Sequence, residues 1–280
     1  MPSIKLYKAT ILSHKTAGRG YYRLVLKAPA AATAAVPGQF VMLRVSEGLD
    51  PLLARPFGIF SVPSKTTIEI VYRVVGRGTM LLSRIEAGHE LVMLGPLGKG
   101  FPAPEKGAIP VMVAGGSGFP PLHFLAEQTD LRNHVFVGAG NKECLPPPAV
   151  LKSFRAHAVR IHVATEDGSS GKKGIITDLV SAFLDAPGRR QNAVVYACGP
   201  HAMLAAVSRI AAEHSIPCYV SMEERMACGL GACMGCSIPQ KAGGYKRACK
   251  EGPVFDSREI DWSEQVRLAM PKVQTGKLLL

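Results

Sequence analysis

Short apolar runs separated by Pro, Gly and Ser turns fill the first hundred residues, a pattern typical of an antiparallel β unit. A helical stretch from about Gly78 to Ile85 interrupts them, and Glu86-Ala87-Gly88 then provides a stop signal. Several short strands at this spacing favour a small β-barrel. The runs that we expect to form strands are Ile4–Leu12, Tyr21–Lys27, Gln39–Val45, Ile68–Val74 and Glu90–Leu94.

From Ala108 onward the pattern changes to buried strands that alternate with helical segments. Strands that alternate with helices form parallel sheets, so we predict a doubly wound α/β unit. A helical segment after the first strand extends to about Gln128. The other expected elements are the strands Ile109–Ala114, His134–Val137, Val159–Ala164 and Ala193–Ala197, and the helices Thr177–Leu184 and His201–His214.

After Pro217 the periodic pattern ends, and residues 222–255 are rich in Cys, Gly, Lys and Met. A unit this small usually needs a metal centre to be ordered. Pro102 and Pro104 mark a linker between the first two units. We therefore expect a β-barrel domain over 1–103, a parallel α/β domain over 104–218, a small cysteine-rich domain over 219–262 and a C-terminal tail over 263–280.

Neither a membrane span nor a signal peptide is predicted. The most apolar region, Ile109–Ala126, is interrupted by glycines and prolines, whereas a span needs about 20 continuous apolar residues. The N-terminal residues lack the long apolar stretch of a signal peptide. We expect a cytoplasmic protein without a membrane partner.

The formal net charge of +12 does not by itself indicate nucleic-acid binding. No basic helix with interleaved aromatic residues and no nucleic-acid module occurs in the sequence, so we expect no nucleic-acid partner. Anionic dinucleotides or an acidic protein surface explain the excess of Lys and Arg equally well.

Four of the seven cysteines lie close together, in the spacing Cys228-x4-Cys233-x2-Cys236-x12-Cys249. This is the plant-type 2Fe-2S ligand pattern. Interspersed glycines let the loop wrap tightly and bring backbone N–H groups towards sulfur. Zinc and simple packing remain alternatives, although structural zinc sites usually present two paired knuckles and Cys249 has no nearby partner.

The other three cysteines, Cys144, Cys198 and Cys218, are scattered. Taken singly they are typical of buried or loop thiols. Because the chain is large and expected to be cytoplasmic, a disulfide framework is not predicted.

Three segments carry signals for anionic cofactors. Arg55-Pro56-Phe57-Gly58 follows a strand, and glycines precede a helix at Thr79, whose N-terminus could bind a pyrophosphate. A surface turn and a Thr79 N-cap are the alternatives. Gly115-Gly116-Ser117-Gly118 lies between a strand and a helix; it is not the G-x-G-x-x-G fingerprint, so alone it does not separate a nucleotide site from a turn.

Taken together, these segments resemble the ferredoxin–NADP reductase superfamily. The likeness extends to a G-P-L-G element at Gly95–Phe101, a T-x-D-G element at Thr165–Ser169 and a C-G-P-x-x-M element at Cys198–Met203. Relatives often have serine at the position of Gly58, so a hydroxyl contact to flavin from that position is in doubt. The resemblance implies FAD binding by Arg55, Pro56, Phe57, Gly58, Val71, Tyr72, Arg73, Gly78 and Thr79, and nicotinamide nucleotide binding by Gly115, Gly116, Gly118, Cys198, Gly199 and Pro200.

With the cysteine segment added, the chain from its first strand to about Asp256 is similar to the electron-transfer subunit of type B dihydroorotate dehydrogenase. This resemblance implies a heterotetramer with an FMN-containing dihydroorotate dehydrogenase catalytic subunit, in pyrimidine biosynthesis. Electrons would pass from that subunit through the 2Fe-2S cluster and FAD to NAD+. It implies no catalytic acid or base in this chain.

Some assignments stay open at this stage. No arginine cluster accompanies the loop Gly138–Glu143, which resembles the adenosine-binding loop, so NAD is favoured over NADP. Glu223 is expected near the nicotinamide or between FAD and the cluster, with a solvated surface carboxylate as the alternative. A reductase for ferredoxin, a sulfur compound or a bifurcating complex is the second enzymatic hypothesis, and a metal-bound interaction module without flavin is the non-enzymatic one.

Overall fold

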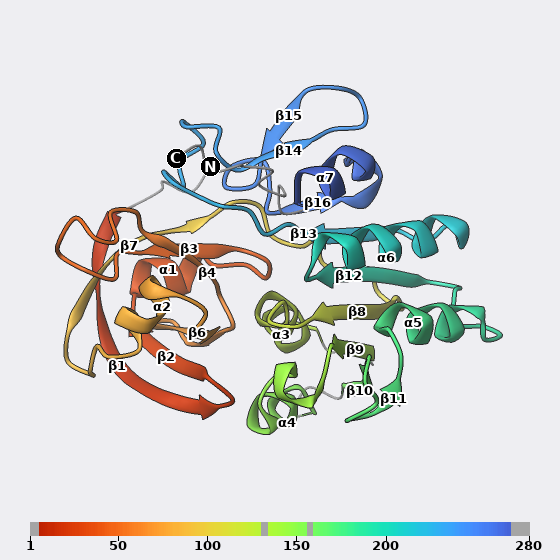
Figure 1. Cartoon of the computed structure of the whole chain (residues 1–280), viewed down its shortest axis with the longest axis horizontal. Coiled ribbons are helices and arrows are strands. Elements are labelled where there is room, and N and C mark those ends of the chain that lie inside the picture. Colours follow the sequence, from red (N-terminus) through yellow and green to blue (C-terminus); the bar gives the residue numbers. More distant parts are fainter. Residues whose placement is uncertain (1–5, 130–133, 156–158, 270–280) are drawn as a thin grey trace, which may run out of the picture.

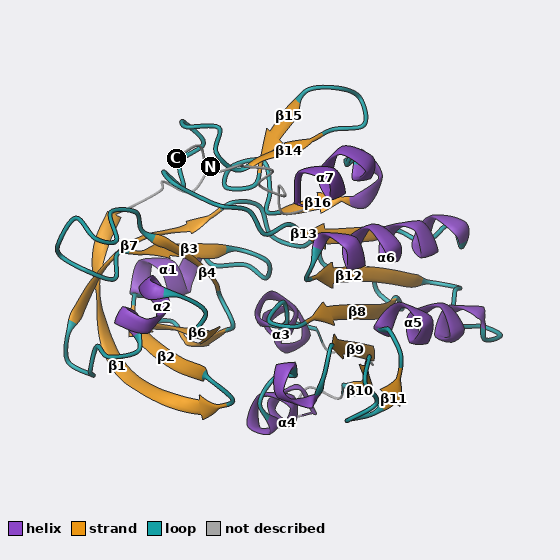
Figure 2. Cartoon of the chain, in the orientation of Figure 1, coloured by secondary structure: helices purple, strands orange, loops and turns teal. Residues whose placement is uncertain are grey.

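Two seven-stranded sheets, with a small C-terminal unit packed on both, make up the computed structural model (Figures 1 and 2). It describes residues 6–129, 134–155 and 159–269. In those residues no helix is long and apolar enough to cross a membrane.

The first sheet is entirely antiparallel and has the strand order β4-β3-β7-β1-β2-β6-β5. Alternate residues of its strands turn inwards to an apolar core that includes Leu24, Leu26, Ile68 and Ile70. Its strands are β1 (Leu6–Gly18), β2 (Tyr21–Lys27), β3 (Phe40–Leu43), β4 (Arg55–Gly58), β5 (Ser61–Ser64), β6 (Thr67–Arg73) and β7 (Glu90–Leu97), accompanied by the short helices α1 (Pro29–Ala34) and α2 (Arg77–Leu82).

The expected β-barrel is corrected to a rolled antiparallel sheet. Its end strands, β4 and β5, do not pair with each other among the described residues. The two strands are consecutive in the chain, and the two residues between them, Ile59 and Phe60, bond to opposite ends of the sheet. Ile59 N–H donates to the Gln39 carbonyl (3.1 Å), whereas Phe60 N–H donates to the Glu69 carbonyl (2.8 Å). The residues between β4 and β5 therefore connect the two ends of the rolled sheet, where a closed barrel would have hydrogen bonds between the two end strands.

The second sheet has the order β11-β10-β9-β8-β12-β13-β16, and every pair is parallel except β13 with β16. This confirms the predicted doubly wound unit. Its strands are β8 (Ile109–Gly115), β9 (His134–Ala139), β10 (Arg160–Thr165), β11 (Lys172–Lys173), β12 (Ala193–Cys198), β13 (Cys218–Ser221) and β16 (Val254–Asp256); its helices are α3 (Pro120–Glu127), α4 (Pro148–Arg155), α5 (Ile176–Asp185) and α6 (His201–Glu213), with the 3₁₀ turn η1 (Lys142–Cys144).

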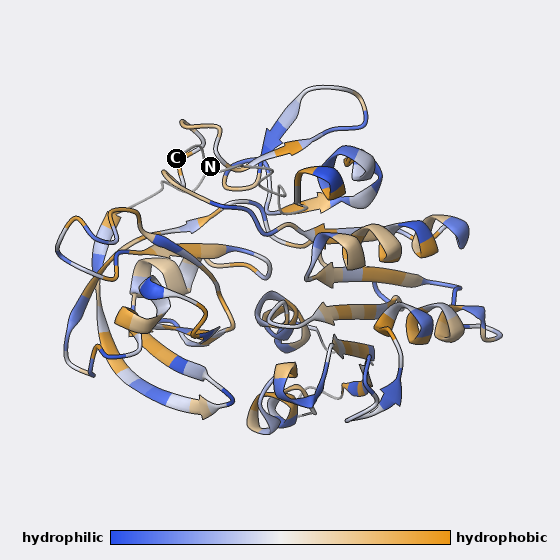
Figure 3. Cartoon of the chain, viewed as in Figure 1, coloured by the Kyte–Doolittle hydropathy of each residue, from blue (hydrophilic) through white to orange (hydrophobic). Residues whose placement is uncertain are grey.

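Both faces of this sheet are buried, because side chains alternate between two apolar layers. On β8, Val111 and Val113 join the core under α5 and α6, while Met112 and Ala114 join the core under α3 and α4. The central strands consequently read as continuous apolar runs (Figure 3).

The C-terminal unit contains β14 (Ser237–Pro239), β15 (Tyr245–Arg247), the 3₁₀ turn η2 (Ser257–Glu259) and α7 (Trp262–Ala269). It packs on both sheets. Its strand β16 extends the second sheet beside β13, and Lys99 N–H after β7 donates to the Gly252 carbonyl at 2.5 Å. Since β13 begins at Cys218 and β16 lies beyond it, the second sheet runs across the expected boundary at 218; the division into domains stays a prediction.

Several elements were not predicted, and each departs from the simple patterns. Pro56 and Pro63 argue against strands, yet β4 and β5 are the edge strands where proline is tolerated. The helix α1 is only six residues long and begins at a proline. The helices α4 and α7 were also missed, and the tail beyond Ala269 lies outside the described residues.

A pair of histidines lies between β9, β10 and α5. His134 Nδ1 is 3.1 Å from His162 Nε2, and the His134 ring packs on Phe183. Burial, and then the charges of His162, Arg189 and Arg160, lower the pKa of His134 to about 4. Protonation is therefore penalised more in the folded than in the unfolded chain.

We predict that the stability of the second sheet falls as the pH drops from about 6.5 towards 4, because the unfolded chain then binds more protons. Replacing His134 by Phe should reduce this loss by roughly 1–3 kcal/mol. The thermal midpoints of wild type and His134→Phe at pH 7 and pH 5 test this, with His89→Gln at an exposed position as control. An equal acid loss in wild type and His134→Phe would contradict the assignment.

Candidate functional site

The carboxyl ends of β8 and β12 lie side by side at the point where the strand order of the second sheet reverses direction. Ligands of open α/β sheets bind at such a switch point. A Cβ atom at Gly118 would overlap the Cys198 carbonyl, and one at Gly115 would lie 2.6 Å from Pro200 Cδ and 2.7 Å from Met203 Sδ. Glycine is required here because the two backbone segments touch.

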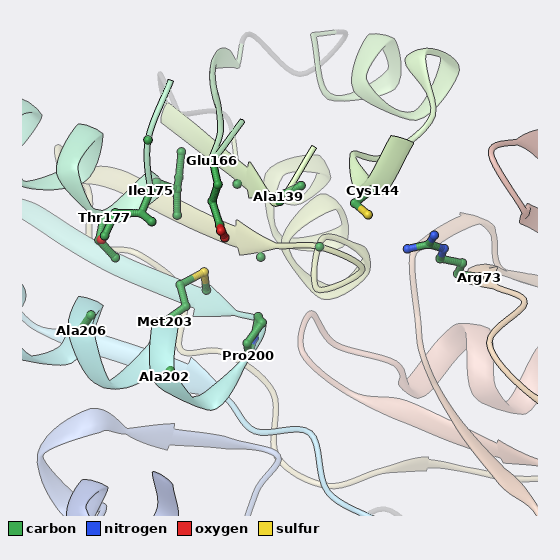
Figure 4. Close-up of a pocket in the computed structure, with 16 residues that line it drawn as sticks. Arg73, Ala139, Cys144, Glu166, Ile175, Thr177, Pro200, Ala202, Met203 and Ala206 are labelled. Atoms are coloured by element: carbon green, nitrogen blue, oxygen red, sulfur yellow. The ribbon is translucent and has the colours of Figure 1, made fainter. Parts of the chain in front are cut away.

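A cavity of about 430 Å³ opens at this switch point. We call it the switch-point pocket (Figure 4). The Glu166 side chain points into it from the end of β10, and Arg73 of the first sheet stands at its far end. Its lining residues are Arg73, Gly115, Gly116, Gly138, Ala139, Gly140, Cys144, Glu166, Gly174, Ile175, Ile176, Thr177, Pro200, Ala202, Met203 and Ala206.

The switch-point pocket has the features of a site for a dinucleotide. Its walls are largely apolar and glycine-rich, and α6 begins beside it at His201, directly after Pro200. The first N–H groups of a helix have no partner within the helix and favour anionic groups. Two of the predicted glycines, Gly115 and Gly116, lie in the lining, whereas Gly118 and Gly199 lie behind it in the tight contact between β8 and β12.

A second cavity, of about 280 Å³, lies between the rolled sheet, the switch point and the segment after β13. We call it the interdomain pocket. Arg73 lines both pockets, so the two meet there. Its lining residues are Gly38, Phe40, Pro56, Phe57, Gly58, Val71, Tyr72, Arg73, Val75, Thr79, Ser117, Pro120, Pro121, Cys198, Ser221, Met222, Glu223, Glu224, Met226 and Pro253.

Next to the interdomain pocket, Arg55 and the start of α2 form a cationic corner. A Cβ atom at Gly78 would lie 2.8 Å from Arg55 Nε, so the guanidinium stem rests directly on that glycine. Gly76 is the N-cap of α2, so the alternative that Thr79 is the N-cap residue is wrong; Thr79 is the N3 residue of a capping box. Its hydroxyl accepts from the N–H groups of Val75 and Gly76 and donates to the Gly76 carbonyl. A guanidinium beside free helix N–H groups is suited to phosphate.

Aromatic packing fixes Tyr72 at the wall of the interdomain pocket. Its ring stacks on Tyr22 (centroids 5.8 Å apart) and meets Phe57 edge-on at 5.4 Å. Its hydroxyl lies 2.9 Å from His14 Nε2. At Gly58 a Cβ atom would meet Pro121 at 3.6 Å and Pro120 at 3.9 Å, both ordinary contact distances, so packing does not explain the absence of serine there.

Cys198 and Glu223 face each other across the interdomain pocket. Cys198 Sγ is 4.0 Å from Glu223 Oε1. Burial, reinforced by Glu223, raises the pKa of the Cys198 thiol well above its usual value. Glu223 lines the interdomain pocket and is exposed in this structure; desolvation by the surrounding protein raises the pKa of its carboxyl, with His201 partly offsetting the effect. The placement of Glu223 near the nicotinamide or between FAD and the cluster therefore stays a prediction.

Three of the clustered cysteines, Cys228, Cys233 and Cys236, lie on the loop before β14, and Cys249 follows β15, so the four thiols lie at different depths. Cys236 and Cys249 are buried, and Cys233 is exposed. Although burial opposes it, backbone N–H groups of Leu230 and Cys233 lower the pKa of Cys228 to about 6. Burial and the neighbouring Cys236 raise the pKa of Cys249 to about 12.

This donor set fits an iron–sulfur cluster in its chemistry. Leu230 N–H points at Cys228 Sγ (3.3 Å), and Cys249 N–H points at Cys236 Sγ (3.5 Å), as expected of donors that stabilise thiolates. In the part of the chain that the structure describes, no three His, Cys, Asp or Glu side chains already stand in a metal-binding arrangement. The ligand assignment therefore rests on the loop and its donors and stays a prediction.

One set of contacts braces the cysteine loop within the C-terminal unit, and another docks it on the first sheet. Within the unit, Arg247 forms an ion pair with Glu251 and donates to the Gly231 carbonyl at 2.5 Å. At Gly229, which has a φ of 69°, a Cβ atom would lie 2.9 Å from Met42 of β3. The loop is thus fixed on the rolled sheet, beside the interdomain pocket that Met226 also lines.

Sequence reasoning missed part of both pocket linings. Cys144 was taken as an ordinary thiol but lines the switch-point pocket. Ser117 and Met203 lie inside recognised motifs without having been singled out, and Glu166 lies in the T-x-D-G element. Position directly after a β-strand end is the signal that could have found Glu166.

Three family models match consecutive parts of the chain. An oxidoreductase FAD-binding domain matches residues 3–101 and an oxidoreductase NAD-binding domain matches residues 112–209. The iron–sulfur cluster binding domain of dihydroorotate dehydrogenase B matches residues 223–261, which contain all four clustered cysteines. FAD, NAD and an iron–sulfur cluster are thus the cofactors of this chain, and the zinc and flavin-free hypotheses are not supported.

A solved structure that resembles the chain along most of its length is that of the NADH-dependent reduced ferredoxin–NADP oxidoreductase, described for flavin-based electron bifurcation. It has a TM-score of 0.79 and 26% identity, covering 92% of this chain and 91% of that one. A ferredoxin–NADP+ reductase from Neisseria gonorrhoeae, with a TM-score of 0.63 and 20% identity over 80% of this chain and 96% of that one, shares the fold.

Curated relatives of similar length carry one common name. The dihydroorotate dehydrogenase B (NAD(+)) electron transfer subunit of Desulforamulus reducens is 38% identical over 265 residues, covering 92% of this chain and 99% of the relative. That of Clostridium acetobutylicum is 36% identical, covering 86% of this chain and 91% of the relative. The chain therefore belongs to the family of dihydroorotate dehydrogenase B electron transfer subunits.

Proposed function

We propose that this chain relays electrons between an FMN-containing dihydroorotate dehydrogenase catalytic subunit and NAD+, in a heterotetramer of the two subunits. The observation that carries the proposal is the meeting of three sites. The switch-point and interdomain pockets share Arg73, and the cysteine loop packs on the rolled sheet beside the second of them. Bound FAD exchanges a hydride with nicotinamide and single electrons with the cluster.

The interdomain pocket is the proposed flavin site. Phe57 and Tyr72 supply flat aromatic walls that suit an isoalloxazine ring. Arg55 and the first N–H groups of α2 would bind the flavin pyrophosphate next to this pocket. Because the Thr79 hydroxyl proton is already donated to Gly76, we assign the contact at that residue to its backbone N–H.

The switch-point pocket is the proposed NAD site. Its glycines allow a pyrophosphate to approach the backbone, and the start of α6 favours negative charge. The shared boundary at Arg73 would let the nicotinamide reach the flavin from the side of the second sheet. Glu223, opposite Cys198, would form the wall at this meeting point.

The exposed side of the cysteine loop is the proposed docking surface for the catalytic subunit. Leu230 and Met234 are about half exposed and flank the exposed Cys233. Apolar side chains around a redox centre would exclude water once a partner covers them. Because the chain also resembles the NADH-dependent reduced ferredoxin–NADP oxidoreductase, the second candidate function is that of a reductase for another acceptor.

The proposed function is tested by mixing the chain with a dihydroorotate-oxidising FMN subunit. We expect the two to co-purify and to reduce NAD+ when dihydroorotate is supplied. Turnover of another acceptor with NADH, without binding to that subunit, would instead favour the second candidate.

For the cluster we predict that Cys233→Ser lowers the iron content from about two per chain to well below one. Cys233 is exposed, so its replacement should leave the fold and the FAD content unchanged. Iron and flavin analysis of the purified variant, with Cys218→Ala as control, measures this. Full iron content in Cys233→Ser, or zinc in the wild type, would contradict the ligand assignment.

For nucleotide choice we predict that Glu166 selects NAD, because its carboxylate faces the pocket where an added 2′-phosphate would be repelled. Glu166→Ser should raise the ratio of kcat/KM for NADPH over NADH by about tenfold, which corresponds to about 1.4 kcal/mol. Glu143→Gln, at an exposed position outside the lining, is the control. If the ratio of kcat/KM for NADPH over NADH is unchanged in Glu166→Ser, Glu166 does not select between the two nucleotides.

At the docking surface, Leu230→Glu should weaken binding of the catalytic subunit by about tenfold or more, because a carboxylate would have to be buried. Leu12→Glu, also at an exposed apolar position but on β1, should bind normally. Titration of labelled catalytic subunit measures both, with the flavin spectrum as the check on folding. Equal affinities for the two variants would exclude Leu230 from the interface.

A further inference from the structure

The helix α7 lies beyond the segment that the iron–sulfur family model matches, which ends at residue 261. It packs on α6 and on β14, between the second sheet and the hairpin of the C-terminal unit (Figure 1). One polar side chain of α7 faces inwards. Gln265 is 1% exposed, whereas the apolar Leu268 of the same helix is 52% exposed.

The Gln265 amide connects two segments at the pocket wall. Its Nε2 donates to Glu224 Oε1 at 2.6 Å and lies 3.4 Å from His201 Nδ1. On the other side of the ring, His201 Nε2 lies 3.0 Å from the Glu223 carbonyl oxygen. The three contacts form a chain from α7 through the start of α6 to the Glu223 backbone.

This chain fixes the tautomer of His201. An amide nitrogen can only donate, so His201 Nδ1 accepts from Gln265 and carries no proton. The proton then sits on Nε2, which faces two acceptors, the Glu223 carbonyl oxygen at 3.0 Å and Glu224 Oε1 at 3.6 Å. Without the Gln265 donor, the opposite tautomer would place two acceptors, Nε2 and the carbonyl oxygen, against each other.

Folding stability does not account for this glutamine. Its Oε1 is buried without a hydrogen-bond partner among the described residues, and an unpaired buried amide oxygen costs free energy. A leucine of similar volume would avoid that cost, but it would leave Glu224 Oε1 and His201 Nδ1 without the donor that Gln265 supplies. The amide is thus better explained by the positions of His201 and Glu224, which it fixes, than by the stability that it adds.

What it holds is part of the interdomain pocket. Glu223 and Glu224 both line that pocket, and Glu223 Oε1 lies 4.0 Å from Cys198 Sγ, which lines it too. The same helix contacts the cluster hairpin, because Tyr245 Oη donates to Glu264 Oε1 at 3.0 Å. The helix α7 therefore joins the hairpin of the cysteine unit to the pocket wall.

We propose that Gln265 is a positioning residue that acts through His201 and Glu224 to hold Glu223 where nicotinamide and flavin meet. The inference rests on the proposed function of the two pockets. It assigns no chemical step to Gln265, which touches neither pocket. It assigns to α7 a role in hydride transfer, not in binding of the nucleotide.

The test compares Gln265→Leu and Gln265→Glu with wild type as holoproteins. Both variants remove the donor to His201, one by an apolar side chain and one by an acceptor of the same shape. Rapid mixing with NADH under anaerobic conditions should show flavin reduction slowed by about three- to tenfold. The dissociation constant for NAD+ should stay within about twofold of wild type, because the lining of the switch-point pocket is unchanged.

Two controls accompany the variants. Leu268→Ala changes an exposed residue of the same helix and should reduce flavin at the wild-type rate. Trp262, the only tryptophan of the chain, lies at the start of α7 and donates to the Ser257 carbonyl, so its emission reports whether the helix is docked.

Each outcome decides the inference. Slow flavin reduction with docked α7 and unchanged NAD+ binding supports it. Wild-type rates in both variants, or undocking of α7 in both, would overturn it, the latter by giving Gln265 a purely structural role. If wild type itself shows no flavin reduction by NADH, the proposed function fails first, so the two failures are distinguishable.

Discussion

The arrangement depends most on the direct backbone contact between the ends of β8 and β12. Gly118 touches the Cys198 carbonyl, and Gly115 meets Pro200 and Met203, with no room for a Cβ atom at either glycine. This close contact leaves the two pockets next to each other. Arg73, from the first sheet, lines both the switch-point pocket and the interdomain pocket.

The C-terminal unit completes the arrangement by docking on both sheets. It contributes β16 to the second sheet, and the cysteine loop rests on β3 through Gly229. Its four thiols differ in environment, since backbone donors lower the pKa of Cys228 while burial raises that of Cys249. Buried thiols of this kind ionise when metal charge is present, so metal binding and the order of the loop are coupled.

Much of this was predictable from sequence because local rules suffice for it. The continuous apolar run of β8 and the alternation of strands with helices predict the doubly wound sheet, and the spacing from Cys228 to Cys249 predicts the cluster. The edge strand β4 was missed because Pro56 argues against a strand until the strand is known to lie at an edge. The roll of the first sheet and the inward position of Gln265 depend on contacts between distant segments, which no local pattern encodes.

The central claim is that one chain passes electrons between nicotinamide and an iron–sulfur cluster through a flavin. Anaerobic addition of NADH to the purified holoprotein, followed by absorbance and electron paramagnetic resonance, tests it most directly. The account predicts that the flavin is bleached and that the signal of a reduced 2Fe-2S cluster then appears. A flavin that NADH does not reduce, or a cluster that stays oxidised while the flavin is reduced, would contradict it.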